Sequence, residues 1–277
     1  MIVSPEQKLA RLEEILSDLG NAVVAFSGGV DSTFLAAAAK RVLGDRAIAV
    51  TAISASYPDG EIDRATAIAE EIGILLETVH TKELDNPDYV QNDPNRCFHC
   101  KSALADKLEE VVGAFGGKYD NLIYGAIADD IGDYRPGMAA AESRGIQAPL
   151  IEAEFTKQDV RAVSKAWGLS TWNDPAAACL SSRIPYGTPV TVEALRMIDQ
   201  AETFLKTLGF VQVRVRHHEE IARIEVLPAD ISRFFEQNIY EKAAEALKSI
   251  GYRYVTLDLE GYRTGSLNEA LLSIQEP

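Results

Sequence analysis

The chain has 277 residues, of which 47% are hydrophobic, and a formal net charge of −15 from 27 Lys and Arg against 42 Asp and Glu. This length and hydrophobic content suffice for one large core or two modest ones, which excludes a disordered or fibrous protein. The negative charge disfavours a general nucleic-acid surface, because neutralising phosphates requires clustered cations. Apolar runs such as 22–26 and 36–39 are far shorter than the roughly 20 residues that span a bilayer. The first residues lack a basic segment followed by an apolar one, so we expect no secretory signal and a cytoplasmic location.

The first half of the chain alternates between helix and strand patterns. Ser4 and Gln7 have the spacing of a capping box before an apolar stripe, which predicts a helix that ends near Gly20. Strands are then expected at 22–26, 47–52, 75–79 and 122–125, and helices at 32–43, 59–72, 101–114 and 156–167. This alternation predicts an α/β fold in which helices cover both faces of a parallel sheet.

The alternation of helix and strand patterns ends near residue 173. The stretch 173–189 is irregular and contains several prolines, which indicates a domain boundary. Beyond it we expect a helix at 192–208, strands at 211–216, 221–226 and 252–259, and helical segments over about 229–250. We therefore predict a first domain over 1–172 and a smaller α+β domain over 173–277, which includes the late cysteine loop and is a candidate for substrate binding and oligomerisation.

A glycine-rich loop separates the first predicted strand from the next helix. Residues 27–33 read Ser-Gly-Gly-Val-Asp-Ser-Thr. The two glycines let the backbone approach a ligand, and the hydroxyls and the helix N-terminus offer hydrogen-bond donors to an anion. The spacing matches neither the kinase-type phosphate loop nor the three-glycine dinucleotide pattern. The loop therefore predicts a phosphate site, and the alternative is a plain turn in which Asp31 caps the helix.

Three cysteines call for a specific explanation. Cys97 and Cys100 are separated by two residues, and Cys179 lies in the irregular stretch. In a reducing compartment this number favours metal or redox chemistry over disulfides. Three thiolates on a [4Fe–4S] cluster would leave one iron able to hold an exogenous sulfide. Two alternatives stay open, which are a zinc site completed by His99, and a redox-active Cys97–Cys100 pair with Cys179 acting alone.

The Ser-Gly-Gly-x-Asp-Ser motif resembles the PP-loop of the ATP pyrophosphatases, whose fold is also called adenine nucleotide α-hydrolase-like. The resemblance implies that ATP is split between its α- and β-phosphates, that the loop holds the departing pyrophosphate, and that a substrate oxygen becomes adenylated. Loop N–H groups and Mg²⁺ would stabilise the charge that grows on pyrophosphate. The residues then expected to bind ATP are Ser27, Gly28, Gly29, Asp31, Ser32 and Gly125, with Asp31 as the Mg²⁺ ligand.

Further motifs narrow this resemblance. Cys-Leu-Ser-Ser-Arg-Ile-Pro-Tyr-Gly at 179–187, Asp-Tyr-Arg-Pro-Gly at 133–137, Arg-Val-Arg at 214–216 and Ile-Ala-Arg-Ile-Glu at 221–225 are similar to the LarE sulfur transferases, over nearly the whole chain. These enzymes insert sulfur into the nickel-pincer nucleotide cofactor of lactate racemase. The resemblance implies that a carboxylate of pyridinium-3,5-biscarboxylic acid mononucleotide is adenylated and thiolated. It also implies a homo-oligomer, a trimer or a hexamer.

The cysteine pattern bears on the source of the sulfur. In the best-known LarE members, one cysteine just ahead of the Ser-Arg-x-Pro-Tyr-Gly run donates its own sulfur and becomes dehydroalanine, and Cys179 occupies that neighbourhood. The additional Cys97 and Cys100 resemble cluster-bearing LarE variants and cluster-dependent tRNA thiolases. We therefore expect all three cysteines to be catalytic cluster ligands that transfer sulfide from an external donor. The alternatives are sacrificial use of Cys179 and tRNA thiolation.

Arginines are candidates for substrate binding. Arg214 and Arg216 alternate on a predicted strand and so share a face, where two guanidinium groups suit a phosphate or carboxylate. The alternative is a solvated face paired with Glu219, Glu220 or Glu225. The residues that we expect to bind the substrate are Ser182, Arg183, Arg214 and Arg216.

Other polar residues are weaker candidates. Glu202 and Glu225 form a secondary metal-binding pair by analogy with the family, and ordinary surface carboxylates are the alternative. His217 and His218 are expected to be exposed at a turn. Three aspartates border the end of the strand at 122–125, where an open parallel sheet places its ligand crevice, and one of them is a candidate to orient Mg²⁺ or ribose: Asp129, Asp130 and Asp133.

Several functions share these features. A tRNA thiolase must bind a folded polyanion, which the net charge of −15 opposes. An amide-forming NAD or GMP synthetase would use ammonia and would not need three cysteines. A regulatory nucleotide-binding module would release no pyrophosphate. We therefore expect an enzyme that uses ATP, Mg²⁺ and a [4Fe–4S] cluster to thiolate a small nucleotide, with no membrane or nucleic-acid partner.

Overall fold

The computed structural model describes residues 4–131, 136–175 and 178–263. The chain divides into two compact units, one over Met1–Ser54, Asp59–Tyr89 and Asn95–Ala177, and the other over Ala55–Pro58, Val90–Pro94 and Ala178–Pro277. The second unit thus includes two short segments from the first half of the chain, which composition alone does not reveal.

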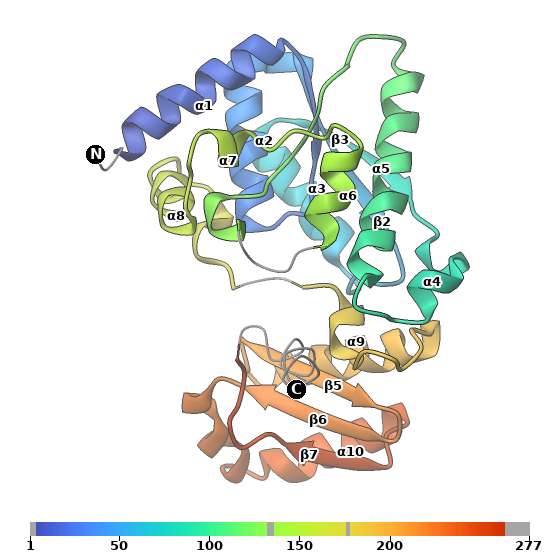
Figure 1. The fold of residues 1–277 in the computed structure, drawn as a ribbon. Helices are drawn as coiled ribbons and strands as arrows, with labels where there is room; N and C mark the ends of the chain where they lie inside the picture. Colours follow the sequence, from blue (N-terminus) through green and yellow to red (C-terminus); the bar gives the residue numbers. More distant parts are fainter. Residues whose placement is uncertain (1–3, 132–135, 176–177, 264–277) are drawn as a thin grey trace, which may run out of the picture. The chain divides into compact units, whose positions relative to one another are not determined.

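The first unit is built on a four-stranded parallel sheet (Figure 1). Its strands are β1 (Ala22–Ala25), β2 (Ala47–Ile53), β3 (Leu75–His80) and β4 (Leu122–Tyr124), in the order β3-β2-β1-β4. Each neighbouring pair is parallel. Successive side chains of a strand point to opposite faces, so Val24 belongs to the core on one face of the sheet and Val23 to the core on the other. The α/β fold with a parallel sheet is therefore confirmed.

Helices cover both faces of this sheet. The core that contains Val24 is completed by α1 (Pro5–Leu19), α2 (Val30–Leu43), α3 (Glu61–Ile72), α7 (Pro149–Glu152) and α8 (Lys157–Ala166). The core that contains Val23 is completed by α5 (Arg96–Ala114) and α6 (Pro136–Ser143), and the short α4 spans Pro87–Val90. Capping boxes begin α1 at Ser4 and α8 at Thr156, as their sequences predict.

The second unit is a smaller α+β structure with a three-stranded sheet. Its strands are β5 (Val213–His218), β6 (Ile221–Val226) and β7 (Tyr254–Leu257), in the order β5-β6-β7. The hairpin β5–β6 is antiparallel, and β7 joins β6 in parallel. Helices α9 (Val192–Thr207) and α10 (Ile239–Ile250) contribute to one core with the sheet residues Val213, Val215, Ala222 and Ile224. The alternate positions of β5 and β6, among them Arg214 and Glu225, therefore face away from this core.

The remaining regular segments are short 3₁₀ turns. They span Gly44–Arg46, Glu83–Asp85, Ala128–Asp130, Ser170–Asn173, Leu180–Arg183 and Pro228–Phe235. Within the described part of the chain, every helix is too short or too polar to cross a membrane.

Candidate active site

The glycine-rich loop lies at the carboxyl end of the parallel sheet. The strand order β3-β2-β1-β4 places a topological switch between β1 and β4, where open parallel sheets bind their ligands. The segments that follow these two strands meet there, because a Cβ atom on Gly125 would lie 2.9 Å from the backbone nitrogen of Ser32. Only glycine therefore fits beside the first turn of α2, which explains the residue at position 125.

Hydroxyl groups fix the shape of the loop. Ser27 Oγ lies 3.0 Å from Ser32 Oγ, and Ser32 Oγ donates to the carbonyl of Gly29 at 3.2 Å. Gly28 has a φ of +68°, a left-handed conformation that favours glycine. Gly29 is the N-cap residue of α2, and no described side chain caps it. The N–H groups of this helix start are thus arranged as a site for an anion.

Asp31 lies within the first turn of α2 and does not occupy the capping position. Its Oδ2 atom forms an ion pair with Lys157 Nζ. Its Oδ1 atom is buried and has no hydrogen-bond partner among the described residues. A buried carboxylate oxygen without a partner, beside a phosphate loop, fits a Mg²⁺ ligand.

Lys157 was not predicted as a site residue. It begins α8, and its backbone nitrogen donates to Asp129 Oδ2 at 2.6 Å. The Thr156 capping box marks the start of this helix and was the signal that could have drawn attention to its first residue. Asp130 Oδ2 accepts a hydrogen bond from the Ile127 nitrogen, and Asp133 lies outside the described residues.

Cys97 and Cys100 lie within the first turns of α5, which begins at Arg96. The expected helix start at residue 101 is therefore wrong. Asn95 is the N-cap residue, and Asn is a residue type that favours this position, so this local signal for the earlier start was missed. Three-residue spacing puts the two thiols on one helical face, and both cysteines are partly exposed and outside any disulfide.

The three-cysteine site stays a prediction. Cys97 and Cys100 belong to the first unit and Cys179 to the second. Among the residues that the structure describes, no three or more His, Cys, Asp or Glu side chains are grouped so as to hold a metal ion. The donor chemistry of the α5 pair, two thiols on one helical face and outside any disulfide, fits a soft metal centre.

Cys179 lies in a tight turn formed by residues 178–183, which we call the Cys179 turn. Its carbonyl oxygen accepts hydrogen bonds from the Ser182 nitrogen at 3.0 Å, from Ser182 Oγ at 2.8 Å and from Arg183 Nη1 at 2.8 Å. The next nitrogen, that of Leu180, donates to the carbonyl of Ser56 at 2.8 Å. The backbone is thus held on both sides of a side chain that is partly exposed.

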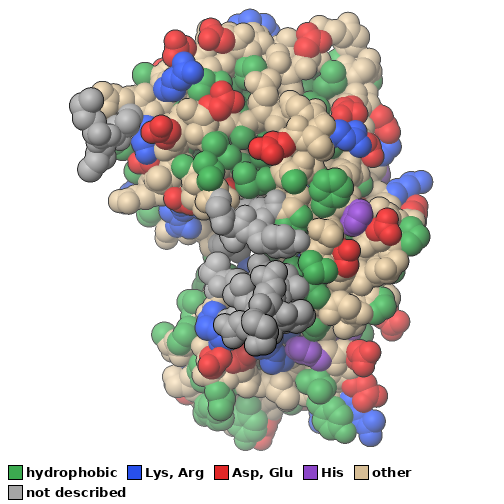
Figure 2. Space-filling model, viewed as in Figure 1, with side chains coloured by type: hydrophobic (Ala, Val, Ile, Leu, Met, Phe, Trp, Pro, Cys, Tyr) green, Lys and Arg blue, Asp and Glu red, His purple; other side chains and the backbone are tan. Residues whose placement is uncertain are grey.

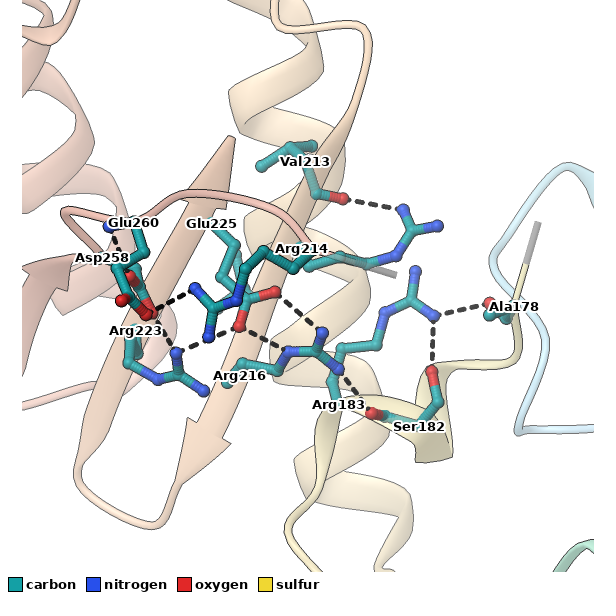
Figure 3. A network of polar contacts seen from close by, with 12 residues as sticks. Ala178, Ser182, Arg183, Val213, Arg214, Arg216, Arg223, Glu225, Asp258 and Glu260 are labelled. Atoms are coloured by element: carbon teal, nitrogen blue, oxygen red, sulfur yellow. Dashed lines mark hydrogen bonds and ion pairs between the residues drawn. The ribbon is translucent and has the colours of Figure 1, made fainter. Parts of the chain in front are cut away.

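Arg183 donates to the backbone of Ala178 and to Ser182 within the Cys179 turn (Figure 3) and also connects this turn to α9. Its Nε and Nη2 atoms donate to the two carboxylate oxygens of Glu202 at 2.8 and 2.9 Å. Both side chains are buried, with exposed fractions of 3% and 2%. Burial alone would lower the pKa of Arg183, but hydrogen bonds and the charge of Glu202 outweigh it and raise that pKa. Arg183 is therefore a permanent cation inside the second unit.

A second buried pair supports the same turn from the sheet. Arg216 donates through Nε and Nη2 to Glu225 at 2.9 and 2.7 Å, and its Nη1 donates to the carbonyl of Ser182 at 2.8 Å (Figure 3). Arg223 also pairs with Glu225. The pairing with Glu225 that the alternative interpretation named is thus present, although Arg216 and Glu225 are buried and the strand face is not solvated there. Because guanidinium groups bind both carboxylates, a metal ion at Glu202 or Glu225 would compete with arginine, and that metal role stays a prediction.

Arg214 lies beside these pairs. Its guanidinium carbon is 5.4 Å from the centre of the Tyr262 ring, and its Nη1 donates to the carbonyl of Val213. Burial, followed by the neighbouring charge of Arg183, lowers the pKa of Arg214. The four residues expected to bind substrate therefore lie in one group around the Cys179 turn: Ser182, Arg183, Arg214 and Arg216.

One expectation about the histidines is wrong. His217 is buried, and its Nδ1 lies 3.2 Å from the hydroxyl oxygen of Tyr252. The strand β5 continues to His218, so His217 follows Val213 and Val215 on the face toward the core. Burial lowers the pKa of His217, and the adjacent His218 adds to this effect. His218 itself is exposed, as predicted.

Known proteins resemble both units of this chain. Residues 10–102, which include the glycine-rich loop, match the family model described as NAD synthase. An uncharacterized protein of Synechocystis sp. is 45% identical over 96% of this chain and 98% of its own length. The pyridinium-3,5-bisthiocarboxylic acid mononucleotide synthase of Lactiplantibacillus plantarum is 39% identical over 97% of this chain and 96% of its own. A glutamine-hydrolysing GMP synthase of Aeropyrum pernix is 25% identical over 70% of this chain and 41% of its own.

These matches agree with the geometry of the first unit. The NAD synthase match covers β1, α2 and β2, which are the elements that frame the glycine-rich loop. The longer match to the synthase of L. plantarum extends across both units. The chain is therefore an ATP-dependent enzyme with a PP-loop, and it belongs to the LarE family.

Proposed function

We propose that this protein is a sulfur transferase that uses ATP to convert pyridinium-3,5-biscarboxylic acid mononucleotide into its thiocarboxylate. The observation that carries this proposal is the similarity to the synthase of L. plantarum over 97% of the chain, which includes both the phosphate loop and the Cys179 turn. One part of such an enzyme must activate a carboxylate, and another must deliver sulfur to it.

Activation falls to the phosphate loop of the first unit. A carboxylate oxygen of the substrate attacks the α-phosphorus of ATP, the bond to the bridging oxygen breaks, and pyrophosphate leaves with the electron pair. Negative charge grows on pyrophosphate, and the N–H groups at the start of α2 stabilise it. Asp31 would hold Mg²⁺, which would neutralise part of this charge, and Lys157, which pairs with Asp31, is a further cation that we propose to bind the phosphates.

The cysteines are the residues that would deliver sulfur. We propose Cys97, Cys100 and Cys179 as ligands of a [4Fe–4S] cluster. Such a cluster leaves one iron without a protein ligand, and that iron can hold the sulfide to be transferred. The chain itself contributes two thiols on one face of α5 and a third on a turn that hydrogen bonds hold in place. The alternative is that Cys179 gives up its own sulfur.

Arg214 is the residue that we propose to contact the nucleotide phosphate or the second carboxylate. It lies on the same strand as Arg216 and close enough to Arg183 for that charge to lower its pKa, so it belongs to the group around the Cys179 turn. A guanidinium group binds such oxygens in a bidentate manner.

Anaerobic reconstitution tests the cluster. We expect a coloured protein that contains about four iron and four sulfide per chain. A colourless protein that binds only zinc would contradict the cluster and favour the zinc alternative. Substitution of each cysteine by serine should abolish iron binding, and a Ser102→Ala variant, changed next to the Cys97–Cys100 segment, is the matched control.

An assay with the mononucleotide, ATP, Mg²⁺ and sulfide tests the reaction. We expect pyrophosphate and thiocarboxylate over many turnovers, while the mass of the protein stays unchanged. A single turnover in which Cys179 loses the mass of hydrogen sulfide would instead establish the sacrificial mechanism. Absence of pyrophosphate with every carboxylate offered would contradict the proposed function.

Transfer RNA is the alternative substrate. On the face drawn in Figure 2, the Lys and Arg side chains of the described residues lie singly or beside Asp and Glu and form no continuous basic surface. We therefore expect no retention of bulk tRNA in a filter-binding test, whereas retention at physiological salt would favour a thiolase. We also propose a trimeric or hexameric homo-oligomer, which sedimentation equilibrium tests.

A further inference from the structure

The guanidinium group of Arg183 makes its hydrogen bonds to other groups of the protein. Its Nε and Nη2 bind the carboxylate of Glu202, and its Nη1 donates to the carbonyls of Ala178 and Cys179 at 2.6 and 2.8 Å. The same Nη1 also lies 2.9 Å from Ser182 Oγ. With only 3% of its side chain exposed, Arg183 has little surface to offer a ligand. Its contacts are instead concentrated on the backbone that carries the Cys179 thiol.

The two buried pairs are themselves anchored in regular structure. Glu202 Oε1 accepts a second hydrogen bond from the backbone nitrogen of Val215 at 2.9 Å, so the carboxylate joins α9 to β5. Arg216, held by Glu225 of β6, donates to the carbonyl of Ser182. Three carbonyls of the Cys179 turn, those of Ala178, Cys179 and Ser182, thus accept hydrogen bonds from arginines whose partners lie on a helix and a strand.

Such an arrangement is costly if it serves stability alone. Taking an arginine and a glutamate out of water carries a desolvation penalty that their attraction repays only with excellent geometry, and well-packed apolar residues often stabilise a core equally well. Here two such pairs support a turn of six residues. The geometry is explained if the position of the turn matters for chemistry, because misplacing a reacting group by about 1 Å can cost two orders of magnitude in rate.

We propose that Arg183 and Glu202, supported by Arg216 and Glu225, are positioning residues that hold the Cys179 turn in the orientation needed for sulfur delivery. This inference rests on the proposed function. It assigns Arg183 and Arg216 to hydrogen bonds with the backbone of the Cys179 turn. It requires that their loss loosens the turn and slows sulfur transfer while adenylation continues.

Hydrogen exchange of the full-length protein tests the first requirement. In Arg183→Lys and Glu202→Gln, we expect the amides of Leu180 and Ser182 to exchange about 10-fold faster, while amides of α10 keep their rates. Arg253→Met, which removes the exposed pair with Glu220, is the matched control and should change none of them. Unchanged exchange at the turn in both variants, or equal acceleration throughout the second unit, would overturn the inference.

A milder variant keeps the inference testable if the loss of Arg183 or Glu202 unfolds the second unit. Ser182→Ala removes one of the three donors to the Cys179 carbonyl and leaves both ion pairs intact. We expect about 3-fold faster exchange at the Leu180 amide and an unchanged melting temperature. Unaltered exchange there would mean that the side-chain contacts do not hold the turn, which also contradicts the inference.

The ratio of thiocarboxylate to pyrophosphate tests the second requirement. We expect this ratio to fall about 10-fold in Arg183→Lys and Glu202→Gln, with the KM for ATP unchanged. A role as substrate ligand would instead raise the KM for the mononucleotide at a constant ratio, and that result would overturn the inference. If the wild-type protein makes no thiocarboxylate, the proposed function fails, whereas the exchange experiment still decides whether these residues hold the turn.

Discussion

Asp31 and Lys157 are the residues through which the phosphate loop handles charge. They neutralise each other through one carboxylate oxygen of Asp31, while the second oxygen is buried and has no hydrogen-bond partner among the described residues. A bound polyphosphate with Mg²⁺ would supply new partners for both, so the ion pair is an arrangement that the ligand can exchange for stronger contacts. The ATP affinity should therefore depend on both side chains.

Replacing Lys157 by Met tests this dependence. The change removes a cation beside the phosphates and leaves the Asp31 charge unpaired, so we expect the KM for ATP to rise about 10-fold or more, measured by pyrophosphate release. Lys165→Met, at the other end of α8 with its ammonium over the Trp172 ring, is the control and should leave KM unchanged. An unaltered KM in Lys157→Met would exclude contact between Lys157 and the phosphates.

His217 makes stability depend on pH. Burial lowers its pKa in the folded state, so the unfolded chain binds a proton more readily. The stability contributed by the neutral ring is complete above the ordinary histidine pKa of about 6.5 and is lost as the pH falls toward the lowered folded value. We expect urea unfolding at pH 7 and pH 5 to show a larger loss for the wild type than for His217→Gln. Equal losses would show that His217 stays neutral or is solvated in both states.

The contact between β4 and α2 links the end of a strand to the phosphate loop. Gly125 follows β4, and the first turn of α2 occupies the space where its side chain would be. Gly125→Ala should therefore push the start of α2 away from the sheet, cost about 1–3 kcal/mol of unfolding free energy and weaken ATP binding. The matched control is Gly113→Ala in α5, where a Cβ would meet nothing within 4 Å and helix propensity improves. Full ATP affinity in Gly125→Ala would contradict this account of the loop.

Elements with local signals could be predicted from the sequence, and those that depend on distant contacts could not. The loop at 27–33 and the capping boxes at Ser4 and Thr156 are complete within a few residues, so the chain alone reveals them. The start of α5 has a weaker signal, because Asn95 is a favoured N-cap residue type but Phe98 stands where a capping box has Glu or Gln. The contact between Lys157 and Asp31 joins residues 126 apart, and no local pattern encodes it.

For the arginines of the candidate site, the direction of the side chains could be predicted from the sequence, whereas their partners could not. Alternation correctly put Arg214 and Arg216 on one face, because side-chain direction in a strand is a local property. The partner of Arg183, Glu202 on α9, follows only from how α9 packs against β5. The pattern at His217 misled because the predicted strand ended two residues too early, which placed a core position in a turn.

The second unit includes a segment from the first half of the sequence, Val90–Pro94, which hydrogen-bonds to its later residues. Asn92 belongs to this unit, and its side-chain amide donates to the carbonyls of Pro185 and Thr188 at 2.7 and 2.8 Å. The backbone oxygen of Asn92 also accepts from Gly187 at 3.0 Å. A segment cut at residue 178 would therefore lose contacts that its own loop requires.

Asn92→Ala in the full chain tests this coupling. The change removes the side-chain donor to the Thr188 carbonyl and one of two donors to the Pro185 carbonyl, which keeps the Thr188 nitrogen. We therefore expect a loss of about 1–3 kcal/mol of unfolding free energy and faster hydrogen exchange over residues 184–190. Gln91→Ala, at the exposed neighbouring position, should have no such effect. Unchanged exchange in Asn92→Ala would show that the loop is independent of the earlier segment.

The pairing of Arg183 with Glu202 has a consequence for how this sequence can vary. An exchange of Arg183 alone leaves a buried anion without its bidentate partner, and an exchange of Glu202 alone leaves a buried cation in that position. Each single substitution is therefore destabilising. A joint replacement of both residues avoids this loss, provided that the new pair still hydrogen-bonds to the carbonyls of Ala178 and Cys179. Libraries that randomise one position at a time would misjudge both, and only paired libraries would recover working combinations.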